Sequence, residues 1–513
     1  MTMYAAIKNW LDDILGKKRY QRYKERETRT QRILGQIFAL LNIPCALYYF
    51  TWCVANANWS YWYAFVPFIL SESFFLVHYL LWIKLLWYKR NHDPKGITPD
   101  NDFSVDIYIP VCGEPVEIIR RTVIAANAIN YSAKTIYILD DGENDQLLHM
   151  ANELNVGYIR RPTHEHRKAG NLNYALKRTS GDLILTLDAD QVADSEILQS
   201  ITGYFSIKRI AFVQTEQRFN LPKNDPWGNS DEVFYKAMQS GKDNDNAAIS
   251  CGNGAIYRRE ALLEIDGFSE WNLVEDLHTS MRLHNKGWKS VYHDTAFTTG
   301  HAPADVSSHL KQRWQWAVDS LRLFFWDSPL RYKGLSWRQK TQYLHFGYNY
   351  ISFGIFLPIF FILPIWALFT HNFMLKADLW QYFLVRLPYF LVYMTANKLL
   401  TNGLNTFKVF QCQSGLFAVY FSAVVTALRC RTKLPNYTVT RKVTQHSKFT
   451  TNLIACWPHI LISIFSVIAI VYGILTIHDD PWFLIVNIFW ACWTIAALNR
   501  FIGLSFWPHL YER

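Results

Sequence analysis

The stretch DLILTLDADQ, residues 182–191, decides the fold. Its centre is apolar and β-prone, as in a strand that is buried on both faces of a parallel sheet, and it ends in Asp188 and Asp190. Other short apolar runs alternate with helical patterns on both sides of it. They are VDIYIPV (105–111), TIYILDDG (135–142), VGYIRRP (156–162) and IAFVQTE (210–216). This alternation predicts an α/β domain with an open, mostly parallel, Rossmann-like sheet.

Carboxylates follow several of these predicted strands. Ligands of open α/β sheets bind beyond the carboxyl ends of the strands. The acidic residues at that edge are Glu114, Asp140, Asp141, Asp188 and Asp190. Because the side chains of a strand alternate between its faces, residues 188 and 190 point the same way, and two hard oxygen ligands suit Mg²⁺ or Mn²⁺. The alternative, that both are solvated loop residues, stays open for an isolated pair.

Three other segments carry candidate functional groups, and each has a simpler structural explanation. ILDDG (138–142) ends a strand in carboxylates that can bind a nucleoside, or forms a plain Asp-Gly turn. EHRKAGNLNYALK (165–177) places Lys168 ahead of a helix, either facing a diphosphate or in an ordinary capped helix. NLVEDLHTSMRL (272–283) places Asp276 at a helix start, either as a general base or as a charge that the helix dipole favours.

The segment HLKQRWQWAVDSLRLFFW (309–326) combines helical periodicity with basic and aromatic residues. That profile is typical of a helix lying in a membrane interface. Its tryptophans are either interfacial anchors or a stacking platform, because flat aromatic faces suit the axial C–H bonds of a pyranose ring.

Long apolar runs flank the α/β segment. Hydrophobic residues make up 50% of the 513 residues, which is rich for a soluble protein. Each run is long enough to cross a hydrocarbon core, which takes roughly 20 residues. The runs with almost no charge are 33–57, 61–83, 343–370, 453–477 and 481–498. A weaker sixth run, 381–400, carries Arg386 and Lys398, and an out-and-back topology needs it.

Basic segments predict the orientation of these runs. The first run follows a polar stretch without a small-residue cleavage site, so we expect a retained helix and not a signal peptide. The segments 17–32 and 89–95 are basic and bracket the first two runs. A basic loop later in the chain contains Arg429, Arg431, Lys433, Arg441, Lys442 and Lys448. The positive-inside rule then predicts an integral protein of the plasma or inner membrane with its α/β domain in the cytoplasm.

The expected layout follows from these assignments. It comprises a basic N-terminus (1–32), two transmembrane helices (33–88), the α/β domain (95–330) with an interfacial helix at 306–326, two transmembrane helices (343–400), an interfacial helix and loop (408–450), and two transmembrane helices (453–505). The sequence continues only to residue 513, so we expect no C-terminal regulatory domain.

Composition argues against two classes of function. The net charge of +10 comes mostly from the basic flanks, and no basic stripe runs through the α/β segment, so we expect no nucleic-acid partner. The eight cysteines are scattered, without CxxC pairs or Cys/His spacing suited to zinc. We therefore expect a reduced protein without a structural zinc site.

The motifs, taken in order, resemble those of the processive, membrane-embedded family 2 glycosyltransferases of the cellulose-synthase and hyaluronan-synthase type. The family pattern DDG, DxD, TED and QxxRW corresponds here to residues 140–142, 188–190, 274–276 and 312–316. SCGNGA (250–255) and YTVTRK (437–442) are similar to the acceptor loop and the gating loop of cellulose synthases. The resemblance covers roughly residues 100–505. It implies a GT-A glycosyltransferase domain inserted between two N-terminal and four C-terminal transmembrane helices.

Residue by residue, the resemblance also implies roles. Asp276 would be the general base, and the metal ligands would be Asp188 and Asp190. Contacts to the nucleotide sugar are expected from Glu114, Asp140, Asp141, Lys168, Asp188, Gln312, Tyr437, Val439 and Thr440, the last three in a lid that excludes water. Contacts to the acceptor are expected from Cys251, Gly252, Glu275 and Trp316.

Two positions depart from the family pattern. Val274 replaces the usual Thr beside the base, which should be tolerated. Gln315 stands where the family has Arg, so a cation expected at the leaving group is missing. Arg313 points elsewhere on an ideal helix and is an imperfect substitute.

The resemblance implies an inverting, Mg²⁺-dependent (or Mn²⁺-dependent) polymerase that transfers a hexose, with UDP-glucose as the expected donor, to a growing β-glucan such as cellulose. The polymer would cross the lipid bilayer between the helices, and we guess Trp366, Tyr389, Trp457 and Trp490 as lining. A periplasmic or cell-wall secretion subunit is a further expected partner. The alternatives left open are another β-linked polysaccharide (mannan or hyaluronan-like), non-processive transfer of a sugar to a lipid carrier, a transporter, and an inactive scaffold.

Overall fold

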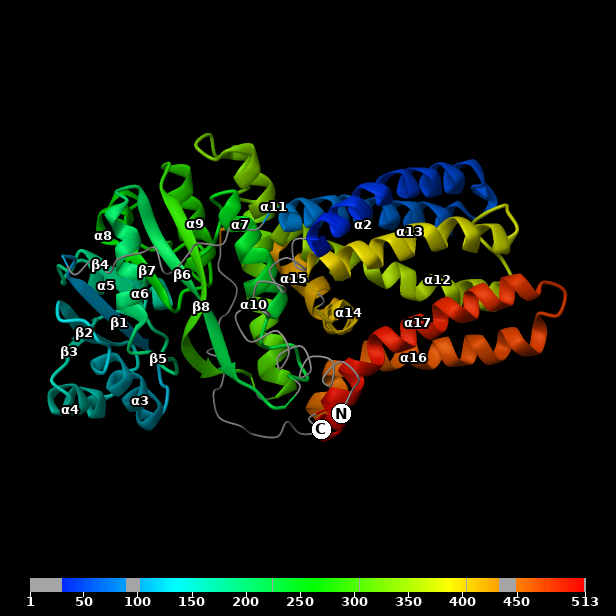
Figure 1. The fold of residues 1–513 in the computed structure, drawn as a ribbon. Helices are drawn as coiled ribbons and strands as arrows, with labels where there is room; N and C mark the ends of the chain where they lie inside the picture. Colours follow the sequence, from blue (N-terminus) through cyan, green and yellow to red (C-terminus); the bar gives the residue numbers. More distant parts are fainter. Residues whose placement is uncertain are drawn as a thin grey trace, which may run out of the picture.

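The computed structural model describes residues 30–88, 102–223, 225–303, 305–402, 404–432 and 449–511. It has two parts, a domain built on a β-sheet and a bundle of long helices (Figure 1). Helix α10 (Val306–Phe325) lies where the two parts meet (Figure 1).

The sheet has eight strands in the order β3-β2-β1-β4-β7-β6-β8-β5. Their bounds are β1 Val105–Val111, β2 Lys134–Asp140, β3 Gly157–Arg160, β4 Leu183–Thr186, β5 Val192–Ala193, β6 Ile210–Asn220, β7 Ala255–Arg258 and β8 Lys289–His301. Strands β3, β2, β1 and β4 are parallel, as are β6 and β8, whereas β7 is antiparallel to both neighbours and β5 is antiparallel to β8. The sheet is therefore mixed, and the predicted α/β fold class is confirmed.

Strand β4 explains why the opening stretch is apolar. Leu183 and Leu185 lie in the core on one side of the sheet, whereas Ile184 lies in the core on the other. Both faces are covered, so each residue of the strand is buried.

Helices cover both faces of the sheet. One core includes residues of α3 (Val116–Asn127), α4 (Asp145–Glu153) and α6 (Ile197–Ile201). The other includes residues of α5 (Arg167–Leu176), α8 (Arg259–Glu264) and α9 (Asp276–Asn285). The remaining helical segments of this domain are η3 (Thr202–Ser206), η4 (Val233–Gln239) and α7 (Ser240–Asn244).

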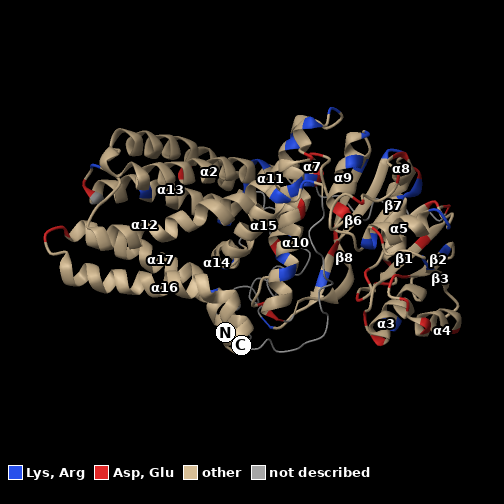
Figure 2. Ribbon diagram, turned by 180° about the vertical axis from the view of Figure 1, so that it is seen from behind, with Lys and Arg blue, Asp and Glu red and all other residues tan. Residues whose placement is uncertain are grey.

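Within the described residues, five helices are long and apolar enough to cross a membrane: Thr30–Ala55, Trp59–Trp87, Trp337–Thr370, Phe449–Thr476 and Pro481–Phe506. A sixth span results if the bent pair Thr406–Ser414 and Phe417–Arg429, at 56° to each other, is counted as one. Charged residues gather on the sheet domain and at the ends of the bundle, and the long helices are almost free of them (Figure 2). This distribution is typical of a membrane protein.

The bundle comprises η1 (Trp59–Tyr61), α2 (Trp62–Trp87), α11 (Trp337–Ile351), η6 (Ser352–Phe356), α12 (Leu357–Thr370), α13 (Leu379–Leu400), α14 (Thr406–Ser414), α15 (Phe417–Arg429), α16 (Phe449–Thr476) and α17 (Pro481–Phe506). Short turns η5 (Pro329–Arg331) and η7 (Pro508–Leu510) complete the helical segments. The weak run 381–400 forms α13, which is not among the five apolar helices but runs alongside them (Figure 1).

The sheet domain docks directly on the bundle. Lys84 of α2 forms an ion pair with Asp245 at 2.9 Å. The buried Lys242 of α7 donates a hydrogen bond to the backbone oxygen of Gln342 in α11 at 2.6 Å. A side chain at Gly241 would meet the backbone oxygen of Leu85, so glycine is required for this close approach of α7 to α2.

Candidate active site

A cavity of about 1090 Å³ extends from the carboxyl ends of the central strands into the helical bundle. Predicted site residues that line it are Glu114, Asp141, Lys168, Asp188, Asp190, Cys251, Glu275, Asp276, Gln312 and Trp316. On the bundle side it is lined by residues that include Glu72, Tyr382, Arg386, Tyr389 and Trp490. The candidate site and the interior of the bundle therefore share one space.

The two aspartates of the opening stretch lie in the turn after β4. Asp188 accepts a hydrogen bond from Lys168 Nζ at 2.7 Å, and its backbone N–H donates to Asn253. Asp190 is buried, and its Oδ2 accepts the backbone N–H of His301 at 3.2 Å. Over the described residues, no group of three or more His, Cys, Asp or Glu side chains is placed to hold a metal ion. Two carboxylates are hard oxygen ligands, of the kind that a divalent cation such as Mg²⁺ combines with oxygens of a substrate and water.

Lys168 connects the groups around this turn. Its Nζ donates to Asp188 and to the backbone oxygen of Gly252 at 2.9 Å, and lies 3.2 Å from Glu275 Oε1. Burial lowers the pKa of Lys168, but the carboxylates of Asp188 and Glu275 outweigh this and raise the pKa well above its usual value. The side chain is therefore an ammonium ion at the centre of an acidic cluster.

Gly252 provides the space in which this cluster assembles. Its φ is +69°, a conformation that side chains with a Cβ rarely adopt. A Cβ there would lie 3.1 Å from both Glu275 Oε1 and Lys168 Nζ, and 3.4 Å from Asp276 Oδ2. These distances bring the acceptor-loop glycine, the lysine and the predicted base together.

Asp276 is the first residue of α9, and its Oδ1 accepts the backbone N–H of Leu277 at 2.6 Å. Burial, followed by the charge of Glu275, raises the pKa of Asp276 to about 8, although Lys168 opposes the shift. A carboxylate with a pKa near the working pH is well suited to general-base catalysis.

Asp319 of α10 holds the segment that precedes this base. The side chain is buried, and its two oxygens accept the backbone N–H groups of Leu273 at 2.9 Å and Val274 at 2.8 Å. This contact fixes the segment leading to Asp276 against the helix that carries Trp316, and the sequence did not predict it.

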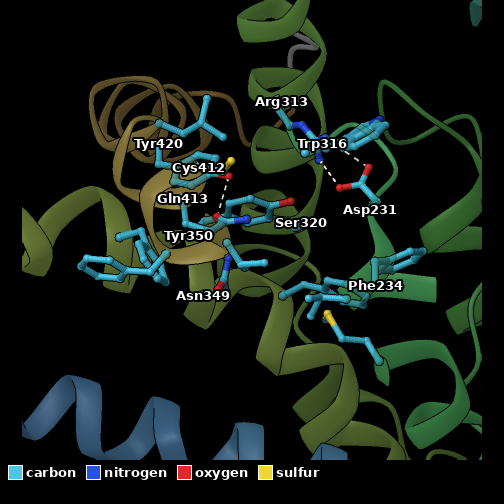
Figure 3. Close-up of a pocket in the computed structure, with 18 of the residues that line it drawn as sticks. Asp231, Phe234, Arg313, Trp316, Ser320, Asn349, Tyr350, Cys412, Gln413 and Tyr420 are labelled. Carbon is cyan, nitrogen blue, oxygen red and sulfur yellow. Dashed lines mark hydrogen bonds and ion pairs between the residues drawn. The ribbon is translucent and has the colours of Figure 1, made fainter. Parts of the chain in front are cut away.

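Arg313 and Trp316 lie on one side of α10 and face Asp231 (Figure 3). The guanidinium of Arg313 contacts both oxygens of Asp231, at 2.9 and 3.1 Å, and lies 4.8 Å from the centre of the Trp316 ring. Gln315, which stands in place of the family arginine, is buried. Arg313 lines the cavity, and its charge is paired with Asp231.

The two aspartates of the DDG motif differ from each other. Asp140 does not appear among the described residues that line the cavity. It is fully buried, and its carboxylate accepts hydrogen bonds from Gly142 N, Tyr158 Oη and Arg160. Asp141 lines the cavity and pairs with Arg161 at 2.6 and 2.7 Å. Asp140 therefore organises the loop beneath the cavity and Asp141 faces it, and the contact with a nucleotide sugar that is expected of both stays a prediction.

The remaining predicted residues have different outcomes. Tyr437, Val439 and Thr440 lie outside the described residues. Of the guessed channel aromatics, Tyr389 and Trp490 line the cavity. The guess was wrong for Trp366 and Trp457, which are absent from the described lining. Trp366 packs against Tyr61 and Tyr63, and Trp457 is 57% exposed on the outside of the bundle.

A charged pair inside the bundle was also missed. Arg386 of α13 lies 2.7 Å from Glu72 of α2, and both line the cavity. The guanidinium also lies over the rings of Tyr49, Tyr389 and Trp490. Arg386 was noted in the sequence only as a weakness of its apolar run, yet a charge in such a run is itself a signal of function.

Comparisons with known proteins agree with this architecture. The model of glycosyltransferase-like family 2 matches residues 105–318, and the cellulose synthase model matches residues 267–505. The chain is 30% identical over 476 residues to "Cellulose synthase 1 catalytic subunit [UDP-forming]" of Komagataeibacter xylinus, covering 88% of this chain and 62% of that protein. It is 37% identical over 268 residues to "Cellulose synthase catalytic subunit [UDP-forming]" of Pseudomonas fluorescens, covering 49% and 36%. The chain thus spans less than two thirds of these relatives.

A solved structure shares the fold. The mannosyltransferase of Pyrobaculum calidifontis, in complex with GDP-Man and Mn²⁺, superimposes with a TM-score of 0.53 at 15% sequence identity, covering 71% of this chain and 99% of the other. The sheet domain is therefore GT-A-like, with apolar helices before and after it.

Proposed function

We propose that this chain is a family 2 glycosyltransferase related to the cellulose synthases, and that it polymerises glucose from UDP-glucose into a β-glucan and passes the product across the membrane. The observation that carries the proposal is the shared cavity, which joins the acidic cluster after β4 to the interior of the bundle. An enzyme that releases a single glycosylated product has no need for such a continuation.

In the proposed reaction, the hydroxyl of the acceptor sugar attacks the anomeric carbon of the donor, and UDP leaves from the opposite side. Asp276 accepts the proton of that hydroxyl, so the displacement inverts the anomeric carbon in one step. No covalent enzyme intermediate is required. Glu275 and Lys168 set the charge around Asp276, and Cys251 and Gly252 bound the acceptor side.

The donor is proposed to bind between the acidic turn and α10. Asp188 and Asp190 would hold Mg²⁺ or Mn²⁺, which supplies positive charge for the leaving diphosphate. Lys168 adds a second cation beside Asp188. Glu114, Asp141 and Gln312 line the same cavity. Glu114, Asp140 and Asp141 are proposed to contact the nucleoside, and Gln312 the diphosphate. The names of the relatives, which are UDP-forming, support uridine as the base. The residues Tyr437, Val439 and Thr440 are proposed as the lid.

The product is proposed to leave along the bundle. A polymer with many hydroxyl groups cannot cross lipid unaided, because buried polar groups without partners are costly. The Glu72–Arg386 pair offers polar partners within the bundle, and Tyr389 and Trp490 offer aromatic faces for pyranose rings. Because the pair carries no net charge, it suits a neutral polymer.

We place the catalytic domain in the cytoplasm, where UDP-sugars are made, because the basic segments 17–32 and 89–95 flank the first two helices. The polymer then emerges on the far side of the plasma or inner membrane. A secretion subunit at that exit is the proposed macromolecular partner.

The test uses the purified full chain with UDP-glucose and Mg²⁺. We expect UDP release and a polymer that β-1,4-glucanase digests, and we expect neither from Asp276→Asn. Release of UDP without polymer, or attachment of one sugar to lipid, would overturn the proposal. A polymer that resists this glucanase but yields to another linkage-specific enzyme would correct the linkage alone.

A further inference from the structure

The ion pair between Asp231 and Arg313 adjoins the ring of Trp316 (Figure 3). Residues 313 and 316 are three apart on α10, so their side chains share a face of the helix. Arg313 contacts both oxygens of Asp231, and its guanidinium carbon is 4.8 Å from the indole centre. A planar guanidinium held by two parallel contacts has a defined orientation. The surface against which the indole packs is therefore fixed.

The backbone at Asp231 is left-handed where it makes this contact. Its φ is +46°, in a region that Asp enters more readily than most residues with a Cβ. Such a conformation persists only where the surrounding structure determines it. Asp225 provides that support, because its carboxylate accepts the backbone N–H groups of Asn229 at 2.8 Å and Ser230 at 3.0 Å. The segment 225–231, called here the platform loop, is thus organised to present Asp231 to α10.

The platform loop is also attached to the membrane bundle. Arg500 of α17 donates to the backbone oxygen of Pro226 at 2.7 Å, and the ring of Trp227 meets that of Phe501 edge-on. At the other end, Asn229 forms a hydrogen bond with His309 of α10 at 2.9 Å. The loop therefore links α17, which borders the cavity, to the helix that carries Trp316.

We propose that Asp231 and Arg313 are positioning residues that hold Trp316 as the platform for the acceptor sugar. Arg313 covers one side of the indole, and the side that borders the cavity receives the pyranose. The orientation of the ring then sets the distance between the acceptor hydroxyl and Asp276. The contact of the platform loop with α17 fixes the position of Trp316 relative to the part of the cavity inside the bundle. This inference rests on the proposed polymerisation. It assigns Arg313 to the acceptor and not to the leaving diphosphate.

The test compares Asp231→Asn, Arg313→Gln and the double variant in the full chain, reconstituted in lipid nanodiscs with UDP-glucose and Mg²⁺. The matched control is Arg120→Gln, which removes an exposed ion pair with Glu153 on the surface of the sheet domain. A displacement of about 1 Å at a reacting group can cost about a hundredfold in the rate of transfer. Release of the polymer then competes better with elongation, so we expect the median product length to fall about tenfold or more. The KM for UDP-glucose should stay within about twofold of the wild-type value, because donor contacts are retained.

The pair acts as a unit, so the double variant should be no worse than the poorer single variant. Arg313→Lys keeps the charge but loses the paired contacts, and we expect product of intermediate length. If the neutral variants fail to fold, Arg313→Lys still tests the positioning role. Wild-type product length from all the variants, or a KM for UDP-glucose that rises in step with the loss of product, would overturn the positioning role. Absence of polymer from the wild-type enzyme would refute the proposed function itself.

Discussion

Replacing Asp319 tests whether the base and the acceptor platform are held together through α10. Its buried carboxylate accepts the backbone N–H groups of Leu273 and Val274, which lead directly to Asp276. Asp319→Ala leaves both N–H groups without a partner, at about 1–3 kcal/mol each, so we expect a loss of roughly 2–6 kcal/mol in the free energy of unfolding. Asp319→Asn should lose about half as much, because its amide accepts one of the two hydrogen bonds.

The catalytic effect should exceed what unfolding explains. With the segment 273–276 released, Asp276 shifts relative to Trp316, and a shift of about 1 Å lowers turnover about a hundredfold. The assay is UDP release per folded molecule, at a temperature where each variant is intact by size-exclusion chromatography. The matched control is Asp305→Asn at the start of the same helix, where either residue caps equally well. Wild-type turnover in Asp319→Ala, or an equal loss in Asp305→Asn, would refute the reasoning.

Three further changes probe other parts of the site. Because the pKa of Asp276 is raised to about 8 and the base must be unprotonated, turnover should rise with pH and level off above about 8; a flat pH–rate profile between 6 and 9 would contradict its role. Gly252→Ala places a Cβ 3.1 Å from Lys168 Nζ at a left-handed backbone position, so we expect roughly 1–2 kcal/mol of strain and strongly reduced turnover, measured by UDP release. The control Gly287→Ala changes a glycine that also has a positive φ but lies in open space, and its turnover should change little. Arg386→Gln should leave the first transfer to a soluble acceptor intact but shorten the polymer, because it leaves Glu72 buried without its cation; full-length product would exclude a role in export.

Local patterns in the sequence predicted the parallel side of the sheet, β3-β2-β1-β4, and strand β6. β4 alternates between two cores, so the run LILTL had to be apolar, and the acidic residues after it had to lie at the ligand edge. β5 has only two residues, and β8 carries many polar side chains, so their periodicity was too weak to predict strands. β7, which is antiparallel to both of its neighbours, was not predicted either. The antiparallel middle of the sheet was therefore missed.

Contacts between distant residues were beyond such patterns. Asp231 and Arg313 are 82 residues apart, and nothing local to either one indicates the other. Asp319 looks like an ordinary polar position on an amphipathic helix until the segment 273–274 is folded against it. Asp140 and Asp141 are neighbours in the chain, yet the first points into hydrogen bonds of its own loop and the second into the cavity. The pattern of apolar and polar residues alone does not predict which of the two side chains faces the cavity.

In the proposed reaction, one cavity both builds the polymer and leads it across the membrane. The most direct measurement uses sealed inverted vesicles, in which the catalytic domain faces outward, supplied with labelled UDP-glucose and Mg²⁺. We expect labelled polymer inside the vesicles, protected from added glucanase until detergent opens them. Polymer that the glucanase digests without detergent, or label confined to a single lipid-linked sugar, would contradict it.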